Sequence, residues 1–389
     1  MHRWLLPEYI ADILPAEARL VEEKRRAVLD LFHASGYDLV SPPLIEYVES
    51  LIGNADDDLD LKTFKLVDQL SGRQMGLRAD ISPQVARLDA HLLNREGVAR
   101  LCYAGTVVHT LPANLLGSRE QLQLGAEIYG HAGVEADLEV IQLMFDSLKL
   151  LGIERVNLDV GDMRIFRSLV DHFKLSEDQI DGLFGAYQRK DAAELDVLVS
   201  TMAAETGRVF KLLSTLNGGV EVLDLAAASL PPLPAIQQAL ADLRAVQKAF
   251  ASSLDELCFD LVELRGAHYH NGLVFAAYAA GWPNALAWGG RYDNAGREFG
   301  RARPATGFCF DLRELTGRLA LGEPQKAILA PYAPEDVVLQ QAIRSLRAQQ
   351  EIVVVDLPGH AAHQGELNVD RELRSVGGEW QLIPFGSGN

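Results

Sequence analysis

Residues 121–129 alternate between apolar and polar positions without a break. The apolar set is Leu122, Leu124, Ala126 and Ile128, and the opposite set includes Gln123, Gly125 and Glu127. A period of two residues is typical of a β-strand that has one face in a core and the other face open. The segment therefore predicts a sheet whose open face carries an amide and a carboxylate. Taken alone, that face is either a solvated surface or the wall of a binding site.

The elements around this strand predict an α+β fold. Strands joined by hairpins, with long helices beside them, indicate an antiparallel sheet covered by helices. One of these helices is expected after residue 81, with Ser82 as its N-cap. We assign residues 1–320 to this core, with a helical insertion near 164–252, and residues 324–389 to a short C-terminal α/β domain.

The overall charge and the cysteines exclude several classes of protein. The net charge of −18, from 36 basic and 54 acidic residues, argues against a broad nucleic-acid footprint, which needs clustered Lys and Arg. Cys102, Cys258 and Cys309 are far apart and do not have the spacing of a zinc site. The longest apolar stretch, residues 272–290, is broken by glycine and proline, so no membrane span is expected. With no signal peptide in the sequence, we predict a cytoplasmic protein.

Four segments carry polar residues that this fold alone does not explain. They are "LRADISPQVARL" (77–88), "QLQLGAEIYG" (121–130), "ELRGAHYHNGLVF" (263–275) and "GGRYDNAGREFGRARPATGFCFDLREL" (289–315). In order and spacing they resemble the histidyl-tRNA synthetase branch of the class II aminoacyl-tRNA synthetases, over residues 5–320. In addition, "GYDLVSPPLIE" (36–46) resembles the first class II motif, whose proline helps to build a dimer interface. The resemblance implies a class II synthetase-like sheet and a two-fold dimer.

The resemblance also implies a pocket for histidine. The residues that match its positions are Asp80, Ser82, Gln123, Glu127, Arg265, Tyr269 and His270. Carboxylates suit an ammonium group, an arginine suits a carboxylate, and an imidazole needs one donor and one acceptor. We expect Asp80 and Glu127 to be ionised at neutral pH, and Gly125 to let the ligand approach the sheet. His268 and His270 have no third ligand nearby, so we expect no metal site.

The motifs that a synthetase uses to bind ATP are altered. Where the family has Phe-Arg-x-Glu, this chain has Val108-His109-Thr110-Leu111, so the arginine that would clamp the α-phosphate is absent. Where the family has Gly-Leu-Glu-Arg, residues 311–314 read Asp-Leu-Arg-Glu. The arginine has moved by one residue, which turns it by about 100° around a helix. Arg119 stands at a position that the family uses near ATP, and His109 is expected to line the pocket or pack.

A chain with the amino-acid pocket, an altered ATP site and a reduced anticodon-binding domain resembles the regulatory subunits of ATP phosphoribosyltransferase. That resemblance implies a protein with no catalytic residues and no cofactor. It implies partnership with the short-form ATP phosphoribosyltransferase catalytic subunit, histidine as the effector, and feedback on the first step of histidine biosynthesis. Two alternatives stay open, a divergent histidyl-tRNA synthetase and an amino-acid-sensing paralogue that serves another partner.

Overall fold

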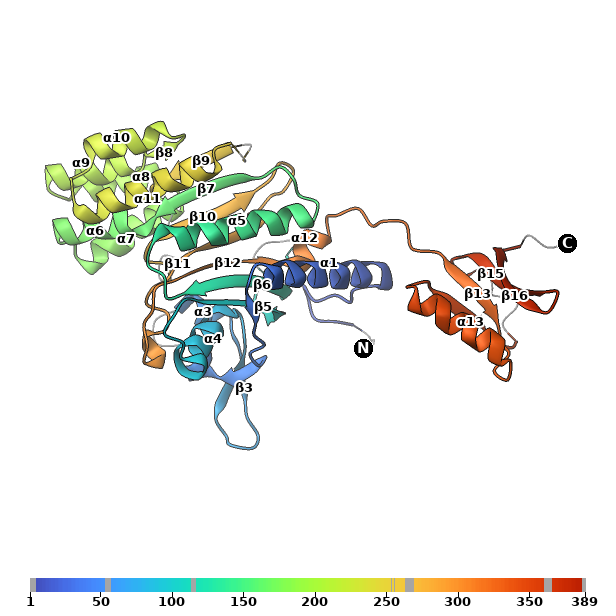
Figure 1. The fold of residues 1–389 in the computed structure, drawn as a ribbon. Helices are drawn as coiled ribbons and strands as arrows, with labels where there is room; N and C mark the ends of the chain where they lie inside the picture. Colours follow the sequence, from blue (N-terminus) through green and yellow to red (C-terminus); the bar gives the residue numbers. More distant parts are fainter. Residues whose placement is uncertain are drawn as a thin grey trace. The chain divides into compact units, whose positions relative to one another are not determined.

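The computed structural model describes residues 5–52, 57–112, 117–252, 254, 256–262, 269–359 and 366–386. The chain divides into two compact units, residues 1–319 and 320–389, and each is described by itself (Figure 1). No helix within the described ranges is long and apolar enough to cross a membrane.

The first unit is built on a nine-stranded sheet with the order β1-β5-β6-β12-β11-β10-β7-β9-β8. In that order the strands are β1 (Asp38–Leu39), β5 (Ala99–Val108), β6 (Glu120–Tyr129), β12 (Ala305–Asp311), β11 (Ala287–Arg291), β10 (Leu273–Tyr278), β7 (Asn157–Asp162), β9 (Glu256–Asp260) and β8 (Asn217–Gly218). All neighbours from β5 to β7 are antiparallel, whereas β1 and β9 join the sheet in parallel. The predicted α+β fold on an antiparallel sheet is therefore confirmed.

Two long helices, α1 (Pro15–Ala34) and α5 (Val134–Leu150), cover one face of this sheet (Figure 1). Leu124, Ala126 and Ile128 of β6 point to that side and are at most 1% exposed in the main core. The alternation predicted for residues 121–129 is correct, because the apolar set faces the helices. The opposite set of side chains, with Gln123 and Glu127, faces the other side of the sheet.

A smaller layer lies on that other side. It contains a three-stranded sheet in the order β2-β4-β3 and several short helices. Its elements are β2 (Ile45–Tyr47), α2 (Val48–Ile52), α3 (Asp57–Lys62), β3 (Phe64–Val67), β4 (Gln74–Leu77), α4 (Ser82–Arg87) and the π-helical turn η1 (Leu88–Leu93). A bridge between Thr63 and His109 joins this layer to the end of β5. β3 and β4 form a hairpin, with Gly72 in its turn at φ +72°.

Helices predominate between β7 and β9. They are α6 (Met163–Phe173), α7 (Glu177–Gln188), α8 (Ala192–Ser200), α9 (Ala204–Leu213), α10 (Glu221–Ser229) and α11 (Pro234–Phe250). The 3₁₀ turn η2 (Arg297–Phe299) precedes β12, and α12 (Leu312–Thr316) follows it. Asp162 caps α6, since its side chain accepts a hydrogen bond from the Arg164 amide.

The second unit is a four-stranded sheet with one helix. The sheet has the order β14-β13-β15-β16, and α13 packs on it through Leu339 and Ile343. Its elements are β13 (Ala327–Pro331), α13 (Val337–Ala348), β14 (Val353–Asp356), β15 (Val369–Val376) and β16 (Glu379–Pro384). β15 was not expected from the sequence, because its alternation is carried mostly by charged residues.

Candidate functional site

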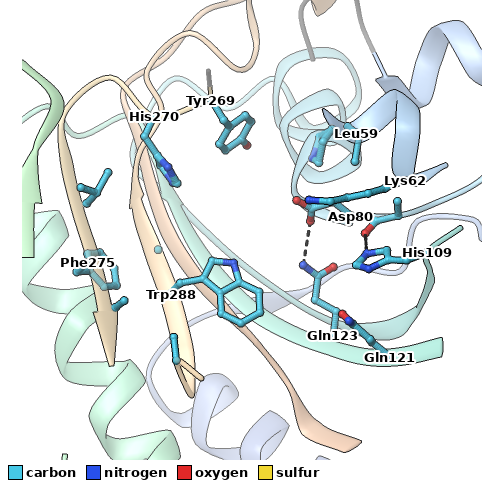
Figure 2. Close-up of a pocket in the computed structure, with 16 residues that line it drawn as sticks. Leu59, Lys62, Asp80, His109, Gln121, Gln123, Tyr269, His270, Phe275 and Trp288 are labelled. Atoms are coloured by element: carbon cyan, nitrogen blue, oxygen red, sulfur yellow. Dashed lines mark hydrogen bonds between the residues drawn. The ribbon is translucent and has the colours of Figure 1, made fainter. Parts of the chain in front are cut away.

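A cavity of about 400 Å³ lies on the polar side of the large sheet (Figure 2). Its floor comes from β6, β10 and β11, and its far wall comes from α3 and the segment that leads into α4. The residues that line it are Leu59, Lys62, Ala79, Asp80, Pro83, His109, Gln121, Gln123, Tyr269, His270, Val274, Phe275, Ala276, Ala285, Trp288 and Gly289. Four of the seven predicted site residues are among them, namely Asp80, Gln123, Tyr269 and His270.

Asp80 and Gln123 form a hydrogen-bonded polar pair at one end of the cavity (Figure 2). The Gln123 side-chain amide donates to Asp80 Oδ1 at 2.9 Å, and its oxygen accepts from the Ile81 backbone at 2.9 Å. The backbone amide of Ser82 also donates to Asp80 Oδ1, at 3.0 Å. These hydrogen bonds fix the carboxylate in position and end on one oxygen, so the other oxygen can accept from a ligand. Among the described residues that line the cavity, Asp80 is the only carboxylate.

Ser82 and Gly125 have different roles from those expected. Ser82 is the first residue of α4 and makes no capping hydrogen bond, so the predicted N-cap is wrong. Its hydroxyl lies 3.1 Å from the Tyr103 hydroxyl instead. Tyr103 is the partner of Gly125 across β5 and β6, and a side chain at position 125 would overlap the Tyr103 ring. Gly125 therefore makes room for Tyr103 and does not admit a ligand to the sheet, because the cross-strand neighbour already fills that space.

Glu127 lies at the same face of β6 but is only 1% exposed and does not line the cavity. Its Oε2 accepts a hydrogen bond from the Tyr129 hydroxyl, and among the described residues Oε1 accepts none of ordinary length. Gly307, opposite Glu127 on β12, leaves the space that the Glu127 and Tyr292 side chains occupy.

Burial raises the pKa of Glu127 to about 7, although the hydroxyls of Tyr129, Ser82 and Tyr292 favour its ionised form. The carboxyl group is therefore not fully ionised at neutral pH, contrary to the expectation, because few polar groups replace the water that it has lost. Burial also raises the pKa of the Tyr103, Tyr129 and Tyr292 hydroxyls well above the usual value, and the charge of Glu127 adds to this effect. These tyrosines are neutral hydrogen-bond donors beside an acid.

Tyr269 and His270 form an aromatic wall at the other end of the cavity. The Tyr269 ring lies 4.7 Å from Tyr292 and 5.4 Å from His270, measured between ring centroids. Gly290 provides the space for the His270 ring, since a Cβ there would lie 2.8 Å from His270 Cδ2. Arg265, the seventh predicted site residue, and its neighbour His268 lie outside the described residues.

Other side chains also line the cavity, and sequence reasoning did not single out Lys62, Gln121 and Trp288 among them as site residues. Gln121 and Trp288 could have been found from the period of two, since each is two residues from a position on the same face of the sheet. Lys62 gives no such signal in the sequence, because only the folding of the chain brings α3 next to the cavity. Trp288 is 42% exposed, and its indole projects into the cavity (Figure 2).

The side chains at the altered ATP motifs are held by contacts within the protein. His109 lines the cavity, as expected, and its Nε2 donates to the Ala79 carbonyl at 2.9 Å. Arg119 donates to the His109 carbonyl at 3.2 Å and covers the Phe64 ring. Arg313 pairs with Glu120 at 3.1 Å.

Acidic groups replace the lost cations near the end of β12. Asp311 caps α12 by accepting from the Arg313 amide, and burial raises its pKa to about 6. Glu314 accepts from the Asn284 side chain at 3.3 Å. Anionic groups oppose the binding of a triphosphate, because like charges repel strongly in a partly buried site. No cluster of three or more His, Cys, Asp or Glu side chains suited to a metal ion occurs in the described part of the chain.

Comparison with known proteins gives matches along nearly the whole chain. Residues 9–315 match the family described as histidyl-tRNA synthetase, and residues 325–383 match the C-terminal domain of the ATP phosphoribosyltransferase subunit HisZ. The chain is 50% identical over 386 residues to the ATP phosphoribosyltransferase regulatory subunit of Nitrosospira multiformis, with 98% of each chain covered. It is 53% identical over 384 residues to the subunit of the same name from Ralstonia nicotianae, with 99% of each covered.

The fold has a close counterpart among solved structures. An ATP phosphoribosyltransferase regulatory subunit/histidyl-tRNA synthetase from Bacillus halodurans superposes with a TM-score of 0.83 at 27% identity, over 95% of this chain and 98% of that chain. This similarity confirms the predicted class II synthetase-like fold. The two regulatory subunits are 50% and 53% identical to this chain over nearly its full length, and the synthetase-like core is followed by a domain of such subunits. The chain therefore belongs to the family of ATP phosphoribosyltransferase regulatory subunits.

Proposed function

We propose that this regulatory subunit binds histidine in the cavity at Asp80 and Gln123 and conveys its presence to a short-form catalytic subunit of ATP phosphoribosyltransferase. The observation that carries the proposal is the Asp80 carboxylate, fixed by Gln123 at 2.9 Å at one end of a cavity that has an aromatic wall at the other end. This arrangement suits an α-ammonium group joined to a flat ring. The regulatory subunit acts in histidine biosynthesis, as its family does.

Each predicted site residue has a role in this proposal. Asp80, Gln123 and Ser82 take the ammonium group, and Arg265 takes the carboxylate of the ligand. Tyr269 and His270 contact the imidazole ring, and Glu127 accepts from a ring nitrogen after small movements of the tyrosines that cover it. An imidazole donor would also satisfy Glu127 Oε1, which accepts no ordinary hydrogen bond from the described residues.

The direct test combines this chain with a short-form catalytic subunit. Phosphoribosyltransferase activity is measured with and without the chain, and then against increasing histidine. We expect histidine to inhibit the complex and to bind the isolated regulatory subunit in calorimetry. Inhibition of the complex without any binding to the isolated chain would move the effector site to the partner or to the interface.

The divergent histidyl-tRNA synthetase is the alternative, and it predicts a different result. We expect no histidine-dependent exchange of pyrophosphate into ATP above a buffer blank, because Arg119 and Arg313 are both held by internal contacts and His109 replaces the phosphate-binding arginine. A histidyl-tRNA synthetase assayed in parallel is the positive control. Exchange at a rate comparable with that control would establish the alternative.

We also propose that the chain forms a two-fold dimer through residues 36–46. β1 is an edge strand of the large sheet, and Leu39 and Ile45 in this segment are 60% and 43% exposed. Exposed apolar side chains beside an open sheet edge are typical of an interface, and two-fold closure is the usual form.

Sedimentation of the isolated chain is expected to give a mass near twice 42.6 kDa. Ile45→Asp should shift the equilibrium to monomer, since it places a charge in the apolar contact. Leu225→Asp is the matched control, because Leu225 is 49% exposed on α10, away from this segment. A monomer at all concentrations, also in the presence of the catalytic subunit, would refute the dimer.

A further inference from the structure

A side chain of the helical insertion reaches a residue that lines the cavity. Arg167, on α6, donates from Nη2 to the backbone carbonyl of His270 at 2.9 Å. We propose that Arg167 is a positioning residue, which holds His270 in place and so sets the affinity of the cavity for the ring of the effector. This inference rests on the proposed function, because it assumes that His270 contacts bound histidine.

The segment after Tyr269 is attached to its surroundings by its backbone. The Asn271 amide donates to the Arg291 carbonyl at 2.8 Å, and the Gly272 carbonyl accepts from the Met163 amide at 2.9 Å. Asn271 also accepts from the Asp293 amide through its side chain, at 3.0 Å. The residues after His270 are thus tied to β11 and to the start of α6. Arg167 acts one residue earlier, at the carbonyl of the residue that enters the cavity.

The helix that carries Arg167 is itself held rigidly. Arg164 pairs with Asp162 at 2.5 Å and with Asp242 of α11 at 2.6 Å. Ile165 and Leu169, on the inner side of α6, are fully buried in the main core. A guanidinium on such a helix has a defined position, so its hydrogen bond can restrain the carbonyl that it reaches. Burial lowers the pKa of the Arg167 guanidinium, and the charge of Asp171, one turn further along α6, offsets part of this effect.

The His270 ring fits a narrow space. It lies over Gly290, which has no side chain, and next to the rings of Tyr269 and Tyr292 at 5.4 and 6.1 Å. A rotation of the His270 peptide would move the ring against these neighbours and change the shape of the ring-binding end. Asp80 and Gln123, which are held by their own hydrogen bonds, would not move with it. Loss of Arg167 should therefore weaken ligand binding through a displaced His270.

The test is a double-mutant cycle measured by calorimetry of histidine binding to the full chain. We expect Arg167→Met to raise the Kd for histidine by about 3- to 30-fold, and Arg167→Lys to recover part of the loss. In a His270→Ala background the same Arg167→Met change should have little further effect, since residues that act through one another are not additive. Arg208→Met, at an exposed position on α9 of the same insertion, is the control and should bind as the wild type does.

The outcomes separate this inference from the proposed function. If wild-type chain and His270→Ala bind with the expected difference but Arg167→Met binds normally, the positioning role is wrong and the proposed site stands. Additive effects of the two substitutions would equally overturn it, because Arg167 would then act independently of His270. If the wild-type chain binds no histidine, the proposed function fails and this inference fails with it. Thermal unfolding of every variant identifies changes in Kd that come from misfolding. If Arg167→Met misfolds, Arg167→Lys replaces it in the comparison with wild type.

Discussion

Replacement of Asp80 by asparagine is expected to raise the histidine concentration for half-inhibition of the catalytic partner by roughly 30-fold to several thousand-fold. The range corresponds to the loss of about 2–5 kcal/mol when one member of a buried charge pair is removed. Asparagine keeps the side-chain oxygen that accepts from Gln123 and from the Ser82 amide. The substitution therefore removes the charge that an α-ammonium group needs and retains the local geometry.

The measurement is a histidine titration of phosphoribosyltransferase activity, with each curve normalised to its own uninhibited rate. Asp178→Asn is the matched control, since Asp178 is an exposed carboxylate on α7 and the same charge is removed far from the cavity. Its curve should overlay that of the wild type. If the Asp80→Asn curve also overlays it, the cavity does not bind the effector and feedback operates elsewhere in the complex.

Replacement of Glu127 by glutamine is expected to raise the free energy of unfolding of the subunit at alkaline pH, measured without histidine. Burial raises the pKa of Glu127 from 4.5 to about 7. Between these values the folded state holds a proton that the unfolded state has released, so the free energy of unfolding falls as pH rises through this window. Glutamine has no proton to lose. We therefore expect Glu127→Gln to be more stable than wild type by up to about 3 kcal/mol at pH 8, and by less than about 1 kcal/mol at pH 5.

Urea denaturation of the isolated chain at pH 5, 6.5 and 8 measures this difference. Glu154→Gln is the control, because Glu154 is exposed between α5 and β7 and should give no gain in stability that grows with pH. A difference between Glu127→Gln and wild type that is constant with pH, or a less stable variant at pH 8, would show that Glu127 is ionised in the folded chain. If Glu127 contacts the imidazole, Glu127→Gln should also make the complex less sensitive to inhibition by histidine. The variant would then gain stability and lose part of its function.

The buried and open faces of the central strand could be predicted, because they follow from the local periodicity of the sequence. The alternation in residues 121–129 correctly placed Leu124 and Ile128 in the core and Gln123 on the opposite face. The amphipathic helix α1 has Ala34 as its last residue, and Gly36 follows at φ +85°, a position where glycine commonly ends a helix. Such signals depend on the geometry of one chain segment, in which each side chain follows from the backbone period.

The cavity could be predicted only in part, and the errors have a common cause. Gly125 was expected to face a ligand, but Tyr103 fills that space from the neighbouring strand. Glu127 was expected to be ionised, but burial raises its pKa, although the hydroxyls of Tyr129 and Tyr292 oppose this shift. Each outcome depends on which residue lies opposite in the next strand, and that register is set by the whole sheet.

The sequence by itself determined the α+β class, the faces of the central strand and the group of segments that share the cavity. Only the tertiary structure decided that Asp80 Oδ1 is fixed by Gln123, that Arg119 and Arg313 are held by internal contacts, and that Arg167 reaches His270. The physical reason is one of range. Periodicity acts between residues a few positions apart. Burial, charge pairing and hydrogen bonds join residues that are distant in the sequence, for example 103 positions apart for Arg167 and His270. The energies of these interactions depend on positions that the folded chain alone defines.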